Sequence, residues 1–101
     1  MVLTLNDEIT VKSKLYDGVE FTIKVLTPKD VETIVLDGDK KTTNAELAEK
    51  YCLSVKGVEY HDKEITDATE LINIGGTTRL IGEIASSILN YAFLGDEEKN
   101  D

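Results

Sequence analysis

Apolar and polar residues alternate through the first quarter of the chain. In residues 9–15 and again in residues 19–25, every second side chain is apolar or small. This period of two is typical of strands that bury one face. Asp17-Gly18 between the two runs indicates a tight turn, so we predict a β-hairpin over residues 9–25. Residues 3–5 are predicted to add a short strand or a lead-in to it.

The length of the hairpin loop decides which face of each strand is buried. A two-residue loop would set lysines beside Phe21, whereas a three-residue loop, residues 16–18, pairs Leu15 with Val19 and keeps the apolar side chains together. Because a slip of one residue exchanges the two faces completely, we predict the three-residue loop. Gly18 then adopts the left-handed conformation of a bulged turn.

Helical spacing of the apolar residues begins near residue 27. Thr27-Pro28-Lys29-Asp30 combines a capping residue, a proline suited to the first turn and a carboxylate at the positive helix end, which predicts a helix that ends at Asp37-Gly38. Thr43 and Glu46 have capping-box spacing and predict a second helix that stops at Gly57. Its apolar face is expected to contain Leu47, Ala48, Tyr51, Cys52 and Val55.

The second half is predicted to continue with a short extended segment and two more helices. A polar turn at residues 61–64 interrupts the extended segment, and Asp67 starts a short helix that breaks at Gly75-Gly76. The last helix, residues 77–94, has apolar residues spaced by four, so its apolar stripe drifts slowly around the helix. The stripe comprises Leu80, Ile81, Ile84, Ala85, Ile88, Leu89, Ala92 and Phe93.

These elements predict an α+β fold, with an N-terminal antiparallel β-hairpin followed by three to four helices that cover one sheet face. A chain of 101 residues is the size of one domain. Within it we expect a β-hairpin part in residues 1–26, a mainly helical part in residues 27–94 and a frayed acidic tail in residues 95–101.

The composition is that of a small acidic globular protein. Hydrophobic residues make up 41% and charged residues 31%, and 20 acidic against 11 basic side chains give a net charge of −9. This charge disfavours nucleic acid and anionic membranes as partners, and no apolar run is long enough to span a bilayer. The single Cys fits a reducing compartment, and the N-terminus lacks the pattern of a signal peptide, so we expect a cytoplasmic protein.

Residues that carry chemistry are few, and each has a simpler structural interpretation. Cys52 and His61 are the only Cys and His, but Cys52 falls on an apolar stripe, where a free Cys is usually a small buried side chain. Asp37-Gly38-Asp39 begins like a calcium loop and then departs from its pattern. Residues 75–79 open a helix without the spacing or the lysine of a phosphate loop. We therefore expect no enzyme activity, no cofactor and no metal, and interpret the carboxylate pairs as a solvated surface.

The apolar stripe of the last helix has two competing interpretations. It packs on the hairpin as ordinary core, or its drift gives two faces, of which one binds a partner or a second copy. We predict a homo-oligomer through residues 77–94. On the second interpretation, Tyr91 and Phe93 are anchors, since aromatic side chains bury a large area with few rotamers to freeze. The candidate partner-binding residues are Leu80, Ile81, Ile84, Ile88, Tyr91, Phe93 and Leu94.

Five short segments between residues 21 and 100 suggest a family. They are Phe21-Thr22-Ile23-Lys24-Val25-Leu26-Thr27-Pro28, Val55-Lys56-Gly57-Val58, Lys63-Glu64-Ile65, Leu80-Ile81-Gly82-Glu83-Ile84 and Leu94-Gly95-Asp96-Glu97-Glu98-Lys99-Asn100. In this order they resemble the small tail assembly chaperones of long-tailed bacteriophages and prophages. The resemblance implies a non-enzymatic protein of the bacterial cytoplasm that coats the tape-measure protein during tail morphogenesis and often self-associates.

The charge of the chain supports a second hypothesis from another class. A small acidic phage-encoded inhibitor would block a basic surface on a host protein or a nucleic-acid-binding protein. The two hypotheses differ in their dependence on salt, because ionic strength screens contacts between exposed charges far more than apolar contacts.

Overall fold

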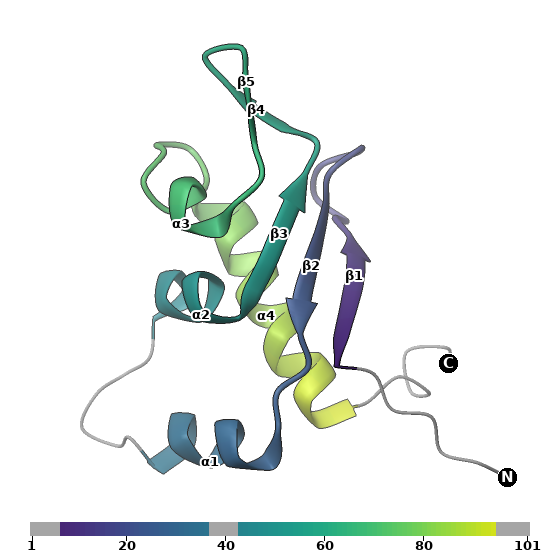
Figure 1. Ribbon diagram of the computed structural model, residues 1–101, viewed down its shortest axis with the longest axis vertical. Coiled ribbons are helices and arrows are strands. Elements are labelled where there is room, and N and C mark those ends of the chain that lie inside the picture. The colour runs from purple at the N-terminus through teal and green to yellow at the C-terminus, as the bar shows by residue number, and fades with distance from the viewer. Residues whose placement is uncertain (1–6, 37–42, 95–101) are drawn as a thin grey trace, which may run out of the picture.

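The computed structural model describes residues 7–36 and 43–94, apart from the side chains of residues 35, 36, 93 and 94. The fold is α+β, as predicted. In the described residues a three-stranded antiparallel sheet has the order β1-β2-β3, and a separate pair of strands, β4-β5, projects from one end (Figure 1). The elements are β1 (Glu8–Lys12), β2 (Glu20–Lys24), α1 (Pro28–Leu36), α2 (Asn44–Tyr51), β3 (Cys52–Lys56), β4 (Val58–Tyr60), β5 (Lys63–Ile65), α3 (Ala68–Leu71) and α4 (Thr78–Leu94).

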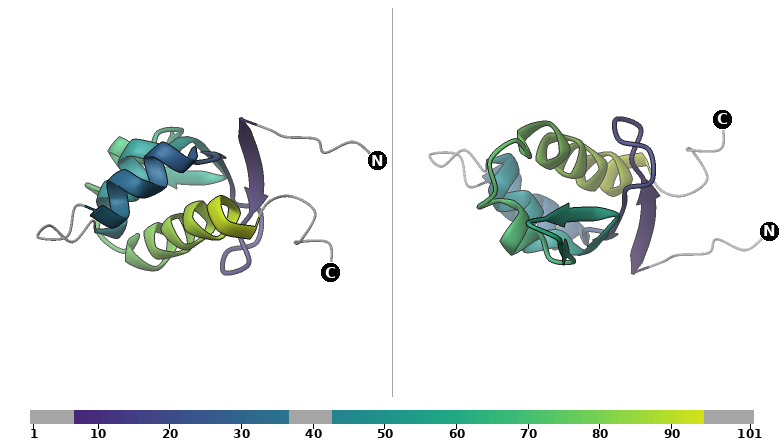
Figure 2. Two further views of the ribbon diagram at one scale, coloured as in Figure 1. Left: turned by 90° about the horizontal axis from the view of Figure 1, so that it is seen from below. Right: turned by 90° about the horizontal axis from the view of Figure 1, so that it is seen from above.

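The long helix α4 covers one face of the three-stranded sheet, and α2 packs against both α4 and β3. In Figure 2, α4 lies along one side of the strands, below them in the left view and above them in the right view, and β1 lies at one side of the described part of the molecule. The other sheet face is turned to solvent, where the Thr10 and Thr22 hydroxyls lie 2.9 Å apart across β1 and β2. Through the ranges 7–36 and 43–94, no helix has the length and apolar character needed to cross a membrane.

The hairpin forms as predicted, but its register differs by two residues. Val11 lies opposite Phe21, and the backbone N–H of Ser13 donates to the Val19 carbonyl at 2.8 Å, so the predicted pairing of Leu15 with Val19 was wrong. The faces are preserved because the shift is even. The Ser13 side chain stabilises the longer loop, because its hydroxyl accepts hydrogen bonds from the N–H groups of residues 15 and 16 at 3.1 and 3.0 Å.

The predicted helix starts at Thr27 and Thr43 are confirmed by their hydrogen bonds. The Thr27 hydroxyl accepts the Asp30 N–H at 3.0 Å, and the Asp30 carboxylate accepts the Thr27 N–H at 3.1 Å, which is a reciprocal cap. This backbone bond, helped by Lys24 at 3.2 Å, lowers the pKa of Asp30. Thr43 caps α2 by accepting the Glu46 N–H. The predicted helix end at residues 37–38 and the predicted segments 3–5 and 95–101 lie outside the described residues.

The second helix is shorter than predicted. The helix ends at Tyr51, and Cys52 and Val55 lie on β3, which pairs antiparallel with β2. The strand carries one extra residue, Leu53, at a register shift opposite β2. A bulge lets two strand residues three positions apart face the same side, so both Cys52 and Val55 are buried. That spacing imitates the helical period, which is why the sequence pattern indicates a helix there.

The segment predicted as extended is a small hairpin, and the short helix is confined to Ala68–Leu71. His61 and Asp62 form the turn of the hairpin, both with positive φ, whereas the other two residues of the predicted polar turn belong to β5. Asp67 caps α3 as predicted, its carboxylate accepting the Thr69 N–H at 2.7 Å.

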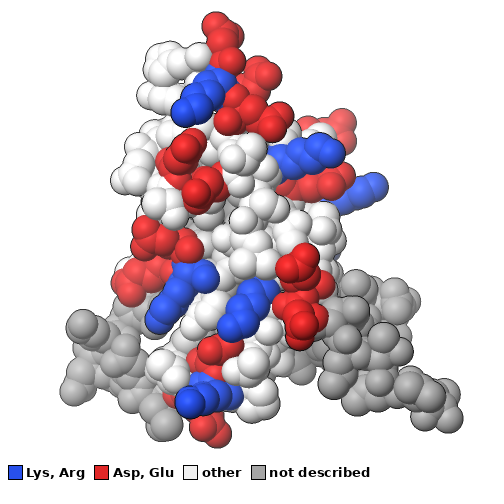
Figure 3. Space-filling model, in the orientation of Figure 1, with Lys and Arg blue, Asp and Glu red and all other residues white. Residues whose placement is uncertain are grey.

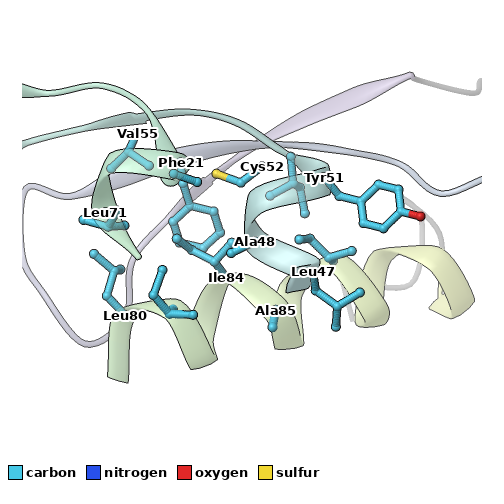
Figure 4. Close-up of a cluster of buried hydrophobic side chains, with 14 of the residues drawn as sticks. Phe21, Leu47, Ala48, Tyr51, Cys52, Val55, Leu71, Leu80, Ile84 and Ala85 are labelled. Carbon is cyan, nitrogen blue, oxygen red and sulfur yellow. The ribbon is translucent and has the colours of Figure 1, made fainter. Parts of the chain in front are cut away.

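The hydrophobic core fills the space between the sheet, α2, α3 and α4. Figure 4 shows Phe21 of β2 pointing toward Ile84 of α4, with side chains of α2 and α3 on either side. Phe21 is 1% exposed and Ile84 is fully buried. Small residues on α4, such as Ala85, allow this helix to approach α2 closely. The core therefore depends on α4 as much as on the sheet.

Candidate functional site: two apolar grooves beside the β4–β5 hairpin

The stripe on α4 is mostly core. Four of the predicted partner-binding residues, Leu80, Ile81, Ile84 and Ile88, are buried, with exposed fractions between 0 and 6%. Tyr91 is half-buried and packs against the core. For Phe93 and Leu94 only the backbone is described, within the last turns of α4.

Cys52 and His61 do not form a nucleophile–base pair. Cys52 is buried on β3, where its thiol donates to the Ser54 carbonyl at 3.5 Å. Burial disfavours the thiolate and raises the pKa of Cys52 to about 11. His61 is exposed at the tip of the β4–β5 hairpin, with its ring centroid 4.1 Å from that of Tyr60. These environments are those of a structural thiol and a surface imidazole.

Metal and anion binding have little support in the part of the chain that the structure describes. Its residues bring together no group of three or more His, Cys, Asp or Glu side chains that could hold a metal ion. The sequence Asp37-Gly38-Asp39 lies outside that part. At the Gly75-Gly76 corner, the Thr77 hydroxyl donates to the carbonyls of Leu71 and Ile74 at 3.0 and 2.8 Å. The Thr77 hydroxyl therefore bonds to a carbonyl at the end of α3 and to one in the connection that follows it, in keeping with the structural interpretation of this corner.

The exposed apolar side chains identify a different surface. Of the large hydrophobic residues that the structure describes as exposed, Leu15 and Tyr16 belong to the β1–β2 loop, Tyr60 to β4, and Leu53 to the bulge in β3. The β1–β2 loop and the β4–β5 hairpin both lie at the upper end of Figure 1. The loop and the hairpin that carry three of these four residues therefore lie at one end of the molecule, and each of the two tyrosines lines a groove.

The first groove, here called the Tyr16 groove, lies between the β1–β2 loop, the start of β4 and the start of α4. Its volume is about 260 Å³. Gly57, with φ of +89°, lets the chain turn from β3 into β4 directly against the Gly18 carbonyl, so the two loops form one wall. Leu80, one of the predicted binding residues, lies in its lining. The lining residues are Tyr16, Val19, Gly57, Val58, Glu59, Gly76, Thr77 and Leu80.

The Tyr16 groove is held in shape by an interaction between distant parts of the chain. Glu83 on α4 accepts the Ser13 hydroxyl at 2.6 Å and the Lys14 N–H at 2.7 Å. A carboxylate acceptor gives stronger hydrogen bonds than a neutral one. The β1–β2 loop, and Tyr16 within it, is thereby fixed relative to α4.

The second groove, here called the Tyr60 groove, lies on α3 and the strands of the β4–β5 hairpin, and its volume is about 400 Å³. Ile65 lies at 3% exposure within it, and Ile74 packs against the core from the α3–α4 connection. The Asn73 side chain is occupied by a 2.9 Å bond to the Thr69 carbonyl. The lining residues are Tyr60, Lys63, Ile65, Thr69, Glu70, Asn73 and Ile74.

Acidic side chains border these grooves on the side of the β4–β5 hairpin. Glu59, Asp62 and Glu64 are exposed on the β4–β5 hairpin, where Lys63 is the one lysine. Figure 3 shows this as a group of acidic side chains at the upper end, while lysines and acids interleave over the rest of the visible face. An apolar groove bordered by carboxylates favours a ligand with apolar anchors and basic flanking residues.

Neither groove was predicted from the sequence. Tyr16 and Tyr60 each stand next to a turn, at Asp17-Gly18 and at His61-Asp62, and an aromatic residue at a turn is a signal of surface exposure. Their grooves also need Leu80 and Ile74 from the distant α3–α4 region. No local pattern in the sequence indicates that these distant residues come together.

Comparisons of the chain with protein-family models, with curated proteins and with solved structures give no match.

Proposed function

We propose that the protein is a non-enzymatic tail assembly chaperone that binds the tape-measure protein during phage tail morphogenesis, in the cytoplasm of the bacterial host. The observation that carries the proposal is the pair of apolar grooves beside the β4–β5 hairpin, each lined by an exposed tyrosine. The segments that resemble tail assembly chaperones support the same assignment. Several of them, including residues 55–58 and 63–65, line these grooves or lie next to them.

The grooves fit short apolar anchors on a helix. A long helical protein presents apolar side chains at regular intervals, and a groove that accepts one or two of them covers that surface until assembly. Tyrosine supports such contacts because it buries a large area with few rotamers to freeze. The carboxylates of the β4–β5 hairpin repel other copies of the chain at high concentration, which keeps a coated helix in solution.

The acidic-inhibitor hypothesis fits the surface less well. A protein that blocks a basic surface by charge needs a broad face of one sign, whereas acids and lysines interleave over most of the face in Figure 3. Across the three strands of the sheet, for example, Glu20 of β2 lies between Lys12 of β1 and Lys56 of β3. The chaperone proposal also gives the apolar grooves a role, and the inhibitor hypothesis leaves them without one.

Co-expression tests the proposal. The proposed partner, a tape-measure protein, would be produced alone, with the wild type and with Tyr16→Ser/Tyr60→Ser, and its soluble fraction measured. We expect the wild type to keep the partner soluble and the double variant to lose most of that effect, because two anchors at about 2 kcal/mol each dominate binding. Leu53→Ser is the matched control, since Leu53 is 50% exposed and lines neither groove. Equal solubility with and without the wild-type chain would refute the proposal.

A further inference from the structure

Among the described residues, no strand pairs with the outer edge of β1, and alternate residues of β1 direct their backbone N–H and C=O groups toward that edge. Within the described residues β1 is an edge strand, with β2 on one side only. The Ser13 N–H bonds to Val19, and the Asp7 carbonyl accepts the Val25 N–H. Odd-numbered residues of β1 therefore direct their backbone groups toward β2, and Glu8, Thr10 and Lys12 direct theirs away from it. These three residues are exposed.

Two rows of residues that lie side by side across the strands end at this edge, one in a positive charge and the other in a negative charge. In one row the register places Lys56, Glu20 and Lys12 side by side, so the row ends at the edge in a positive charge. In the other row Lys24 lies opposite Glu8, so that row ends in a negative charge. Thr10 stands midway between the two ends. The edge is self-complementary, since a two-fold rotation about Thr10 brings each charge opposite its counterpart.

We propose that β1 pairs antiparallel with β1 of a second copy of this chain, centred on Thr10, and joins the two three-stranded sheets into one. The pairing sets Glu8 opposite the second copy's Lys12 and forms about six main-chain hydrogen bonds, because the residues that face outward are the ones that meet. It continues the alternation of charge across the junction. On the inner face, the pairing brings the half-buried Ile9 side chain of each copy against the half-buried Val11 side chain of the other copy.

Charged residues on edge strands usually prevent such pairing. Here they are placed with opposite signs at equal distances from Thr10, so in this one register they attract, and a shift by two residues loses that match. A single five-residue strand provides a small interface, so the dimer forms reversibly and depends on concentration. This inference is independent of the proposed tape-measure partner and uses a surface away from both grooves.

Charge exchange at the edge tests the pairing. The full chain would be examined by sedimentation equilibrium as wild type, Glu8→Lys, Lys12→Glu, the equal mixture of these two variants, and Glu8→Lys/Lys12→Glu. Each single variant places like charges opposite each other twice and should dimerise about tenfold or more weakly. The mixture should dimerise like the wild type, since every contact between the two different chains is again between opposite charges.

The double variant separates pairing from folding. Inside the chain it sets a lysine against Lys24 and a glutamate against Glu20, which are both unfavourable contacts, yet it restores opposite charges between copies. We expect it to dimerise like the wild type even if its melting temperature is lower. A monomeric wild type at high concentration overturns the proposal. Dimerisation that does not respond to these substitutions also overturns it, and assigns self-association to another surface.

Discussion

The Glu83 carboxylate on α4 accepts a hydrogen bond from the Ser13 hydroxyl at 2.6 Å, across 70 positions of sequence. A second bond, from the Lys14 N–H at 2.7 Å, engages the other carboxylate oxygen. One side chain of the long helix thus determines the conformation of the β1–β2 loop and the position of Tyr16. This contact and the two bonds that the Ser13 hydroxyl accepts within the loop together stabilise a loop longer than the hairpin pattern predicts.

Removing this carboxylate should loosen the loop and leave the core intact. We expect Glu83→Ala to lower the free energy of unfolding by about 1–3 kcal/mol, because charge-assisted hydrogen bonds to the loop are lost. Urea denaturation measures the change. Glu83→Gln, which keeps one side-chain oxygen as an acceptor but removes the charge, should cost less than Glu83→Ala. An equal or larger effect of Glu83→Gln would contradict the assigned role of the Glu83 carboxylate.

The two glycines where the hairpin loop meets the β3–β4 turn should differ in their tolerance of a side chain. Both have positive φ, +86° at Gly18 and +89° at Gly57, so alanine at either costs about 1 kcal/mol or more in backbone strain. A Cβ at Gly57 would also overlap the Gly18 carbonyl, whereas a Cβ at Gly18 meets open space. We expect Gly57→Ala to be the more destabilising by thermal denaturation. The opposite order would show that the two loops are not in contact in solution.

Cys52 should be unreactive in the folded protein. Since burial raises the pKa of its thiol to about 11, alkylation at about pH 8 should be roughly a hundredfold slower than for an exposed thiol, and it should recover in denaturant. The unfolded thiol ionises at a lower pH than the folded one. Its contribution to stability is therefore fully present below about pH 8.5 and declines as the pH rises toward 11. Rapid alkylation of the native chain would contradict the buried position of β3.

Truncating a core side chain should cost much more stability than truncating a groove side chain. Ile84→Ala should cost about 2–5 kcal/mol of stability, because the side chain is fully buried against the sheet. Tyr60→Ser, at a side chain 46% exposed, should stay within about 1 kcal/mol by the same denaturation measurement. A near-neutral Ile84→Ala would mean that α4 is not packed on the sheet as described.

Local signals in the sequence predicted the helix starts and the last helix correctly. The caps at Thr27, Thr43 and Asp67 form as their spacing indicates, because each uses atoms within three residues of the cap. The helical spacing over residues 77–94 also corresponds to α4. The start and middle of its stripe pack into the core with residues of the sheet, α2 and α3, whereas Leu89 and Ala92 near its end are only half-buried.

The failures share a physical cause, which is pairing between distant segments. Cys52 and Val55 have helical spacing, but an edge of β2 was available and the bulge at Leu53 made the spacing compatible with a strand. The hairpin loop was set by Glu83 from the other end of the chain. The grooves combine residues from the two hairpins with the α3–α4 connection, so their existence depends on tertiary structure alone.

The central claim is that this chain holds a long helical partner through apolar grooves, and isothermal titration tests it most directly. The purified chain would be titrated with a helical segment of the tape-measure protein at about 0.1 M and about 1 M salt, where screening lengths are about 10 and 3 Å. We predict binding whose affinity falls by less than about tenfold at the higher salt and is lost in Tyr16→Ser/Tyr60→Ser, while Leu53→Ser binds like the wild type. Absence of binding at either salt, or binding that vanishes at high salt and ignores the two tyrosines, would contradict the account.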